Sequence, residues 1–355
     1  MMSFSVRVGA AVAGLAVAAV ALLTFERPPV LAVQSGYRGT GEVQVYNPRT
    51  LANVVVPANQ VPQGIAQVPD VGPRAGQIYQ NVRVLGDLSV GQFTRLMAAM
   101  TTWVGGEQGC QYCHVGNNMA DEGKYTKQVS RRMLQMVRHI NEQWTSHVGQ
   151  TGVTCYTCHR GRGVPQYVWS SAGDEAGVPG TGFANIATGQ NIAAPAINQT
   201  SLPNDPFTPF LWRDTPIRVI GPRDPMAATA GNSHSIKQAE WTYSLMVHMS
   251  QSLGVNCTFC HNSRSFFDWE QSAPQRTTAW HGIRMVRDVN ANYVEPLRPN
   301  FPANRLGPHG DTLKVNCTTC HQGAYRPLLG AAMAAQYPEL TRVNLTAPIT
   351  VAPRQ

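Results

Sequence analysis

All eight cysteines of this 355-residue chain fall within four copies of one pattern, Cys-x-x-Cys-His. The copies begin at Cys110, Cys155, Cys257 and Cys317. Two thiols three positions apart can reach the two vinyl groups on one edge of a porphyrin, and the adjacent histidine then lies under the iron, so the pattern is the attachment signature of c-type haem. The sequence therefore predicts four covalently attached haems and leaves no cysteine for a disulfide.

Each copy supplies two thiols and one axial imidazole. The predicted haem-attaching cysteines are Cys110, Cys113, Cys155, Cys158, Cys257, Cys260, Cys317 and Cys320. The predicted proximal iron ligands are His114, His159, His261 and His321. A single copy could also belong to a zinc site or to a redox dithiol. Four copies, each with its histidine, favour haem over both alternatives.

The composition indicates a chain rich in irregular connections. Hydrophobic residues make up 43% of the chain and charged residues only 14%, and there are 32 glycines and 25 prolines. The formal charge of +8 would ordinarily favour an acidic partner or a membrane surface. Four haems would add about eight propionate charges that offset it. We therefore predict a mainly α fold with much irregular coil and no nucleic-acid partner.

An amphipathic helix is predicted before each cysteine motif. Apolar residues recur at three- and four-residue spacing over residues 90–104, 128–144, 236–253 and 276–293, which is the period of a helix that buries one stripe. The first two helix–turn–motif units are close together in the chain, and so are the last two. An internal duplication that gives two pseudo-symmetric halves is the simplest explanation of this order.

These units and the stretches between them divide the chain into six predicted segments. We expect a membrane anchor, an extended periplasmic arm, the units of the first and second haems, an irregular linker, the units of the third and fourth haems, and a C-terminal coil. Their predicted bounds, in the same order, are 1–27, 28–88, 89–165, 166–235, 236–325 and 326–355. Repeated Gly, Pro, Asn and Ser in the linker are typical of loops.

The N-terminal apolar run predicts the anchor. Residues 8–25 carry no charge and lie between Arg7 and Glu26. The length is near the minimum for crossing about 30 Å of hydrocarbon. A cleaved signal peptide is the alternative, but we expect a retained single-pass helix, with Arg7 on the cytoplasmic side and the bulk of the chain in the periplasm. No cysteine follows the run, which excludes a lipoprotein anchor.

Each iron also needs a distal ligand, and methionine gives a higher potential than histidine. Aligning the helices offers two registers. The first is Met97, Met133, Met246 and Gly282, and the second is Met100, Met136, Met249 and Met285. Periodicity does not choose between them. Glycine inside a helix costs about 1 kcal/mol relative to alanine, so Gly282 indicates that something flat, such as a haem plane, closely approaches the helix backbone.

If the first register ligates, the fourth haem must take its distal ligand from elsewhere. His147 follows the second helix, in a loop from which it could reach a neighbouring haem. His309 lies in a Gly-Pro turn before the fourth motif and competes with it. Met285 stays open as a third candidate. We expect His139 and His248, which lie on helices, to be packed or exposed.

Over roughly residues 70–330 the chain resembles the tetrahaem cytochrome c subunit of purple bacterial photosynthetic reaction centres. The resemblance rests on the four motifs, the long gap between the second and third, the helix before each motif and the position of His147. It implies that Met97, Met133 and Met246 are the distal ligands of the first three haems and that His147 is the distal ligand of the fourth. One departure is the apolar N-terminal run, because many family members carry a lipid-modified cysteine there.

The resemblance also implies a function and partners. It implies an electron-transfer subunit, not an enzyme, that sits on the periplasmic face of the reaction-centre L and M subunits at the photosynthetic inner membrane. Such a subunit re-reduces the photo-oxidised bacteriochlorophyll pair with electrons from a soluble carrier, either a small cytochrome c or a high-potential iron–sulfur protein. As a further hypothesis, Arg160, Arg162 and Arg264 closely follow ligating histidines and pair with haem propionates.

Three other functions are compatible with four such motifs. A membrane-anchored tetrahaem quinol dehydrogenase also has an N-terminal helix, but such proteins are usually shorter, with more closely spaced motifs. A multihaem reductase would need an iron with an open coordination site, whereas four distal ligands leave none open. An electron-storage scaffold without a fixed partner is disfavoured by the anchor.

Overall fold

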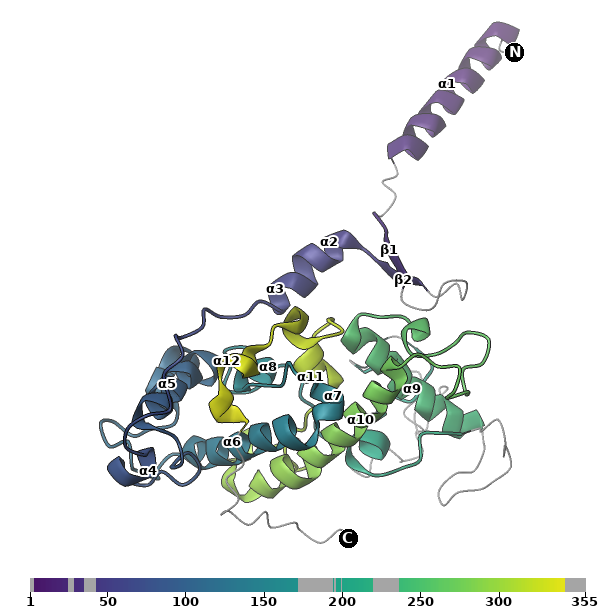
Figure 1. The fold of residues 1–355 in the computed structure, drawn as a ribbon. Helices are drawn as coiled ribbons and strands as arrows, with labels where there is room; N and C mark the ends of the chain where they lie inside the picture. Colours follow the sequence, from purple (N-terminus) through teal and green to yellow (C-terminus); the bar gives the residue numbers. More distant parts are fainter. Residues whose placement is uncertain are drawn as a thin grey trace.

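The structure is a computed structural model that describes residues 3–24, 29–34, 43–171, 194, 196–198, 200–219 and 236–341. Most of the predicted linker (166–235) and the last part of the predicted C-terminal coil (342–355) lie outside these ranges. The described chain is mainly helical, with long irregular connections and a single two-stranded sheet (Figure 1). The prediction of a mainly α fold with much coil is therefore confirmed.

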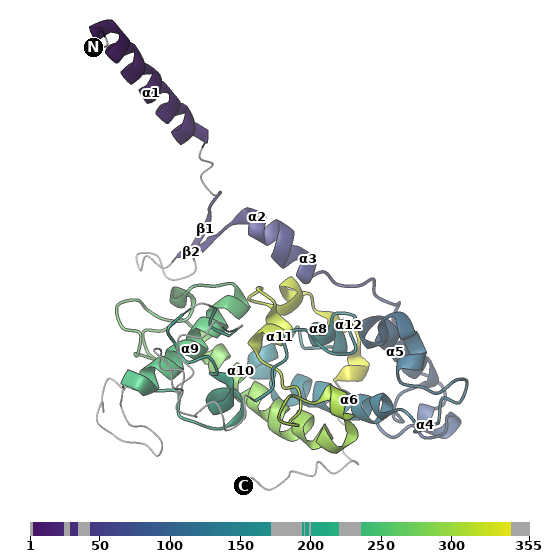
Figure 2. The same ribbon diagram turned by 180° about the vertical axis from the view of Figure 1, so that it is seen from behind.

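The N-terminal helix α1 (Phe4–Thr24) projects away from the rest of the chain (Figures 1 and 2). Its mean hydropathy is 2.2 and none of its residues is buried. Its 21 residues at 1.5 Å each span about 30 Å, the thickness of a bilayer core. The helix therefore fits a membrane anchor, as predicted.

Strands β1 (Leu31–Gln34) and β2 (Val43–Tyr46) follow α1 and pair antiparallel, with Leu31 opposite Tyr46. A helical run comes next, made of α2 (Pro48–Thr50), a π-helical turn (Leu51–Val55) and α3 (Val56–Ala58). The sequence predicted an extended arm over this region, with little helical periodicity. The structure differs from this prediction in having the β1–β2 hairpin and the helical run 48–58 in the arm.

Four long helices carry the main body: α5 (Val90–Met100), α6 (Tyr125–Gln143), α9 (Ile236–Leu253) and α10 (Gln275–Asp288). All four predicted amphipathic helices are present. Two of them continue as π-helical turns, Thr101–Gly105 after α5 and Val289–Val294 after α10. Ser89 caps α5, because its side chain accepts a hydrogen bond from the Gln92 N–H.

Short helical segments join these long helices. The α-helical ones are α4 (Ala75–Ile78), α7 (Thr145–Val148), α8 (Cys155–His159), α11 (Cys317–His321) and α12 (Met333–Gln336). The 3-10 turns are Gly106–Tyr112, Cys257–Phe259, Glu295–Asn300, Ala303–Arg305, Pro327–Gly330 and Pro338–Leu340, and Thr208–Trp212 is π-helical. The second and fourth cysteine motifs are thus themselves helices.

The buried apolar side chains form two large clusters and a small one. The first cluster packs α5 and α6 against the C-terminal segment through Leu96, Leu134 and Leu340. The second packs α9 and α10 against the segment after residue 200, through Leu245 and Ile283. The small cluster joins Ile140 of α6 to Val289 and Val294 after α10. The helix pairs α5–α6 and α9–α10 therefore each have their own core.

A buried ion pair fastens the C-terminal segment to α5. Arg95 Nη1 lies 3.0 Å from Glu339 Oε1, and the two side chains are 2% and 1% exposed. The guanidinium also donates to the carbonyls of Ala66 and Gln336 and stacks over the Tyr337 ring, 3.9 Å from its centroid. A buried carboxylate without its cation is strongly destabilising.

We expect Arg95→Met to lower the free energy of unfolding by about 3–5 kcal/mol, because it leaves the Glu339 charge buried and unpaired. Chemical unfolding followed by circular dichroism measures this loss. Lys237→Met is the control, since it breaks the more exposed Lys237–Glu240 pair and should cost about 0–1 kcal/mol. Equal losses in the two variants would contradict the assignment of Arg95.

Candidate haem-binding site

A large cavity of about 1430 Å³ lies between the two helix pairs. Pockets for a single small ligand are typically about 300–1000 Å³, so this cavity has room for more than one flat cofactor. Its walls carry the proximal histidines of three motifs, His114, His159 and His321, and also His147. Seven of the eight motif cysteines line it as well: Cys110, Cys113, Cys155, Cys158, Cys260, Cys317 and Cys320.

The third motif lies at the edge of this cavity. Cys260 lines it, whereas Cys257 and His261 do not. The His261 ring stacks on Phe266, with ring centroids 5.4 Å apart, and Phe266 is 48% exposed. The third candidate haem site therefore lies near the surface, as does the first, and the leading cysteine of each, Cys257 and Cys110, is exposed.

Every predicted ligating histidine turns the same ring nitrogen to a backbone carbonyl. The Nδ1–oxygen distances are 3.0 Å from His114 to Met119, 2.8 Å from His159 to Arg162, 2.7 Å from His261 to Phe266, 3.1 Å from His321 to Ala324 and 2.9 Å from His147 to Thr278. A carbonyl only accepts, so Nδ1 carries the proton and the lone pair is on Nε2. Metal-ligating histidines are held in this way.

Burial keeps these imidazoles neutral. It lowers the pKa of His147 and of His159, and it lowers the pKa of His321 to about 4. Iron binds the neutral ring, because the lone pair must be free. The five rings are therefore in the right tautomer and charge state to be axial ligands. In the described residues no three His, Cys, Asp or Glu side chains cluster as they would around a bare metal ion.

The four motifs have two local geometries. In the second and fourth, a capping box starts a helix: the Thr154 N–H donates to the Thr157 hydroxyl, and the Asn316 N–H donates to the Thr319 hydroxyl, each at 2.9 Å. In the first and third, the start of the motif lies in a 3-10 turn, and the histidine contacts the carbonyl five residues ahead instead of three. The first motif therefore shares its local geometry with the third, and the second shares its geometry with the fourth.

His147 docks on α10 at the position of Gly282. A Cβ at residue 282 would lie 2.5 Å from His147 Cε1 and 2.8 Å from Nδ1, so only glycine leaves room for the ring. Thr278, one turn earlier on α10, accepts the Nδ1 proton. The flat group against Gly282 is thus the His147 imidazole, not the haem plane that the sequence suggested. The imidazole fills the direction in which a first-register methionine would project.

His147 also faces the proximal histidine of the fourth motif. The ring centroids of His147 and His321 are 6.1 Å apart. Two metal–nitrogen bonds of about 2 Å each, with about 1 Å more from each nitrogen to its ring centre, span about 6 Å. The centroid separation therefore matches the one expected for two imidazoles that would share one iron.

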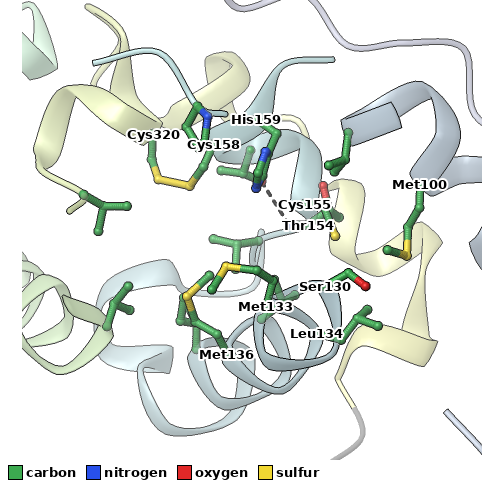
Figure 3. A pocket seen from close by; sticks show the side chains of 18 of the residues that line it. Met100, Ser130, Met133, Leu134, Met136, Thr154, Cys155, Cys158, His159 and Cys320 are labelled. Carbon is green, nitrogen blue, oxygen red and sulfur yellow. Dashed lines mark hydrogen bonds between the residues drawn. A yellow bond between two sulfur atoms is a disulfide. The ribbon is translucent and has the colours of Figure 1, made fainter. Parts of the chain in front are cut away.

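The candidate methionines divide between the cavity and the cores. Met97, Met100, Met133 and Met136 line the cavity, as do Met249 and Met285. Met133 and Met136 project from α6 toward His159 and the Cys158–Cys320 pair (Figure 3). Met246 is half-buried against the α9–α10 core and does not line the cavity. Position alone therefore does not choose one register for every haem.

The cavity wall does not include three further candidate histidines, His309, His139 and His248. His309, the competitor for the fourth haem, is exposed and outside the cavity wall. His139 Nε2 pairs with Asp288 at 2.7 Å. His248 is 3% exposed and packs on Phe207, with ring centroids 4.6 Å apart. The prediction that His139 and His248 are packed or exposed is confirmed.

The structure joins Cys158 and Cys320 by a disulfide, with Cα atoms 4.4 Å apart (Figure 3). This contradicts the expectation that no cysteine enters a disulfide. The physical reason is that α8 and α11 pack together and their second cysteines face each other. A sulfur in a disulfide cannot also form a thioether, so the pairing and haem attachment at these two positions exclude each other.

Arg160 takes a role that the sequence did not reveal. Its guanidinium donates to the backbone carbonyls of Ala58 and Cys320, at 2.7 and 2.8 Å, and to Asn59 Oδ1 at 3.2 Å. Burial lowers its pKa to about 10. Through these acceptors Arg160 ties the second motif to the fourth. Arg162 and Arg264 are exposed.

Asn59 and Gln44 are the other residues that sequence reasoning missed. Asn59, 2% exposed, donates to the Gln322 carbonyl after the fourth motif and accepts from the Leu328 N–H and from Arg160. Gln44 exchanges two 2.7 Å hydrogen bonds with Asn256, the residue before the third motif. Neither residue has a local motif, because the partners of Gln44 and Asn59 lie 100 to 270 positions away. The arm therefore holds three of the four motifs.

Comparison with known proteins agrees with this site. The family model described as the photosynthetic reaction centre cytochrome C subunit matches residues 26–341. A photosynthetic reaction center cytochrome c subunit of Rubrivivax gelatinosus is 56% identical over 330 residues, covering 92% of this chain and 87% of the relative. That of Thermochromatium tepidum is 51% identical over 333 residues, covering 93% and 80%. Cytochrome c-554 of Chloroflexus aurantiacus is 29% identical over 315 residues, covering 72% and 73%.

Attachment motifs, neutral imidazoles and the shared cavity together define a c-type cytochrome, an electron-transfer protein that binds haem. Within that class, the chain belongs to the photosynthetic reaction centre cytochrome c subunit family. This membership rules against the quinol dehydrogenase alternative. It also makes the chain part of a photosynthetic electron-transport complex, to which the apolar helix α1 fits as a membrane anchor.

We expect Gly282→Ala to displace the His147 ring, because the added methyl would overlap Cε1. If His147 ligates an iron, the electron paramagnetic resonance spectrum will lose one low-spin signal with two histidine ligands. Gly105→Ala is the matched control, since its added Cβ meets nothing closer than 3.8 Å. An unchanged spectrum in Gly282→Ala would contradict this role of His147.

Proposed function

We propose that this chain carries four covalently attached haems in the periplasm and re-reduces the photo-oxidised bacteriochlorophyll pair of a reaction centre. The observation that carries the proposal is the set of five buried or half-buried imidazoles, each with Nδ1 held by a carbonyl. Each haem, when bound, supplies one Fe(II)/Fe(III) couple. Family membership supports the photosynthetic role.

In the proposal, His114, His159, His261 and His321 are the proximal ligands, and the eight motif cysteines form thioethers. Met97, Met133 and Met246 are distal ligands of the first three haems, and His147 is that of the fourth. The 6.1 Å spacing of His147 and His321 and the exposure of His309 support the fourth assignment. Because histidine lowers the potential relative to methionine, we expect the fourth site to be low in potential.

The local geometries support an internal duplication. Motifs one and three share one turn type and motifs two and four share another, and each helix pair has its own apolar core. Two pseudo-symmetric halves would present the haem edges to one common cavity. The Met, Leu and Val side chains of its walls would keep water from the bound haems, so that the surroundings of an iron would reorganise little when its charge changes.

The proposed partners follow from family membership and the anchor. The L and M subunits would bind the chain on the periplasmic face of the inner membrane, with α1 as a single-pass tether. A soluble small cytochrome c or high-potential iron–sulfur protein would supply the electrons. Nothing in this function requires a catalytic acid, base or nucleophile, so the chain would act as an electron carrier and not as an enzyme.

A laser flash on membranes poised with the haems reduced tests this function. We expect oxidation of c-type haem within microseconds, with the same kinetics as re-reduction of the bacteriochlorophyll cation. The haem α-band and the cation band record the two reactions. Flash-formed cation that decays without any haem oxidation would contradict the proposal.

The mass of the purified chain tests the haem count. We expect four covalent haems and the loss of the Cys158–Cys320 disulfide, because each of these two sulfurs would instead be thioether-bonded to a porphyrin. Cys158→Ser should leave one haem bound by a single thioether and shift its α-band, while the other three stay unchanged. A chain with the Cys158–Cys320 disulfide and fewer haems would contradict the assignment of these two cysteines.

A further inference from the structure

A buried lysine lies beside the histidine of the first motif. Lys127, in the first turn of α6, is 7% exposed. Its Nζ donates to the carbonyls of Asp121 at 2.6 Å and Met119 at 2.9 Å. A buried lysine is uncommon unless it is paired, and here two carbonyls from the loop after the motif hold its ammonium group.

The Met119 carbonyl has a second donor. His114 Nδ1 lies 3.0 Å from the same oxygen. A carbonyl oxygen has two lone pairs, so it accepts from the imidazole and the ammonium together. Lys127 and His114 are thus coupled through one backbone atom, without touching each other.

This coupling should change the midpoint potential of an iron bound to His114 in one direction. An ammonium bonded to the carbonyl draws electron density from its oxygen, which then accepts less strongly from the His114 Nδ1–H. The imidazole becomes a weaker electron donor at Nε2, because hydrogen bonding at the far nitrogen sets ligand basicity. The positive charge itself also opposes oxidation of a nearby metal. Both effects favour the reduced iron and raise its midpoint potential.

The neighbouring charges do not cancel Lys127. Glu122 Oε1 is 3.5 Å from its Nζ, but that carboxylate is bound bidentately by Arg131, at 2.5 and 2.7 Å. Arg131 holds the pKa of Glu122 down to about 2. Lys124 adds another cation, whose Nζ donates to the Gln111 carbonyl. With Lys124, Lys127 and Arg131 set against Asp121 and Glu122, the groups around His114 carry one net positive charge.

The third motif provides an internal comparison. Arg276 occupies the corresponding first turn of α10 and donates to the Asp268 carbonyl at 2.9 Å and to Ser272 Oγ at 2.7 Å. The carbonyl that accepts from His261 is that of Phe266, and among the described hydrogen bonds no cation donates to it. Of these two motifs, the first alone has the shared-carbonyl contact among the described hydrogen bonds.

We propose that Lys127 is a positioning residue that raises the midpoint potential of the first haem by sharing the Met119 carbonyl with His114. The inference rests on the proposed function, because it requires a haem on the first motif with His114 as ligand. It adds a way of separating haem potentials that does not depend on the identity of the distal ligand.

Redox titration of the full complex, followed in the haem α-band, tests this inference. We expect Lys127→Met to shift one midpoint downward and leave the other three unchanged. The shifted wave should be the one that Met97→His displaces. Lys127→Arg should stay close to the wild-type midpoint, since the guanidinium keeps the positive charge and can donate to the Met119 carbonyl. Lys124→Met is the control: it removes the same charge from the same loop, but that lysine contacts a different carbonyl.

The inference is overturned if all four midpoints stay at wild-type values, or if Lys124→Met produces the same shift as Lys127→Met. Should Lys127→Met fail to bind the first haem, Lys127→Gln replaces it, because the amide can still donate to one carbonyl without the charge. The midpoint potential of the first haem in Lys127→Gln must then lie below that of the wild type. Failure of the proposed function is distinguishable, because fewer than four haems would then be found in the wild-type chain itself.

Discussion

The bond from histidine Nδ1 to a backbone carbonyl is the interaction on which the site depends. It fixes the tautomer, leaves the Nε2 lone pair free for an iron, and recurs at all five predicted ligands. The backbone turns that follow the motifs bring these carbonyls to the rings. Arg160 and Gln322 adopt left-handed conformations, with φ of 51° and 47°, directly after the second and fourth motifs, where the chain turns back so that a carbonyl meets the ring.

The N-terminal arm adds long-range order to these local turns. The side-chain amides of Gln44 and Asn59 form hydrogen bonds with segments next to three of the motifs. Arg160 links the second motif to the fourth. The arm lies over α8 and α11 in both views (Figures 1 and 2). In the proposed function, rigid motifs matter because electron transfer depends steeply on the separation of the cofactors and gains nothing from moving parts.

Much of this could be predicted from the sequence, and the limits are physical. The 236–253 helix coincides with α9, because a strong apolar period leaves little choice. Gly282 was recognised as a place of close approach, but its partner was not, since His147 comes from 135 positions earlier, a separation that no local pattern encodes. The Lys127 contact was missed for the same reason: a lysine near a motif is ordinary in sequence, and only the fold shows that it shares a carbonyl with His114.

An experimental density map of the membrane complex tests the central claim most directly. The account predicts a porphyrin between His147 and His321, with iron bonded to Nε2 of both rings, and with the sulfurs of Cys158 and Cys320 on two separate porphyrins. A map in which these cysteines remain joined, or in which His147 packs on Gly282 without an iron at Nε2, would contradict it.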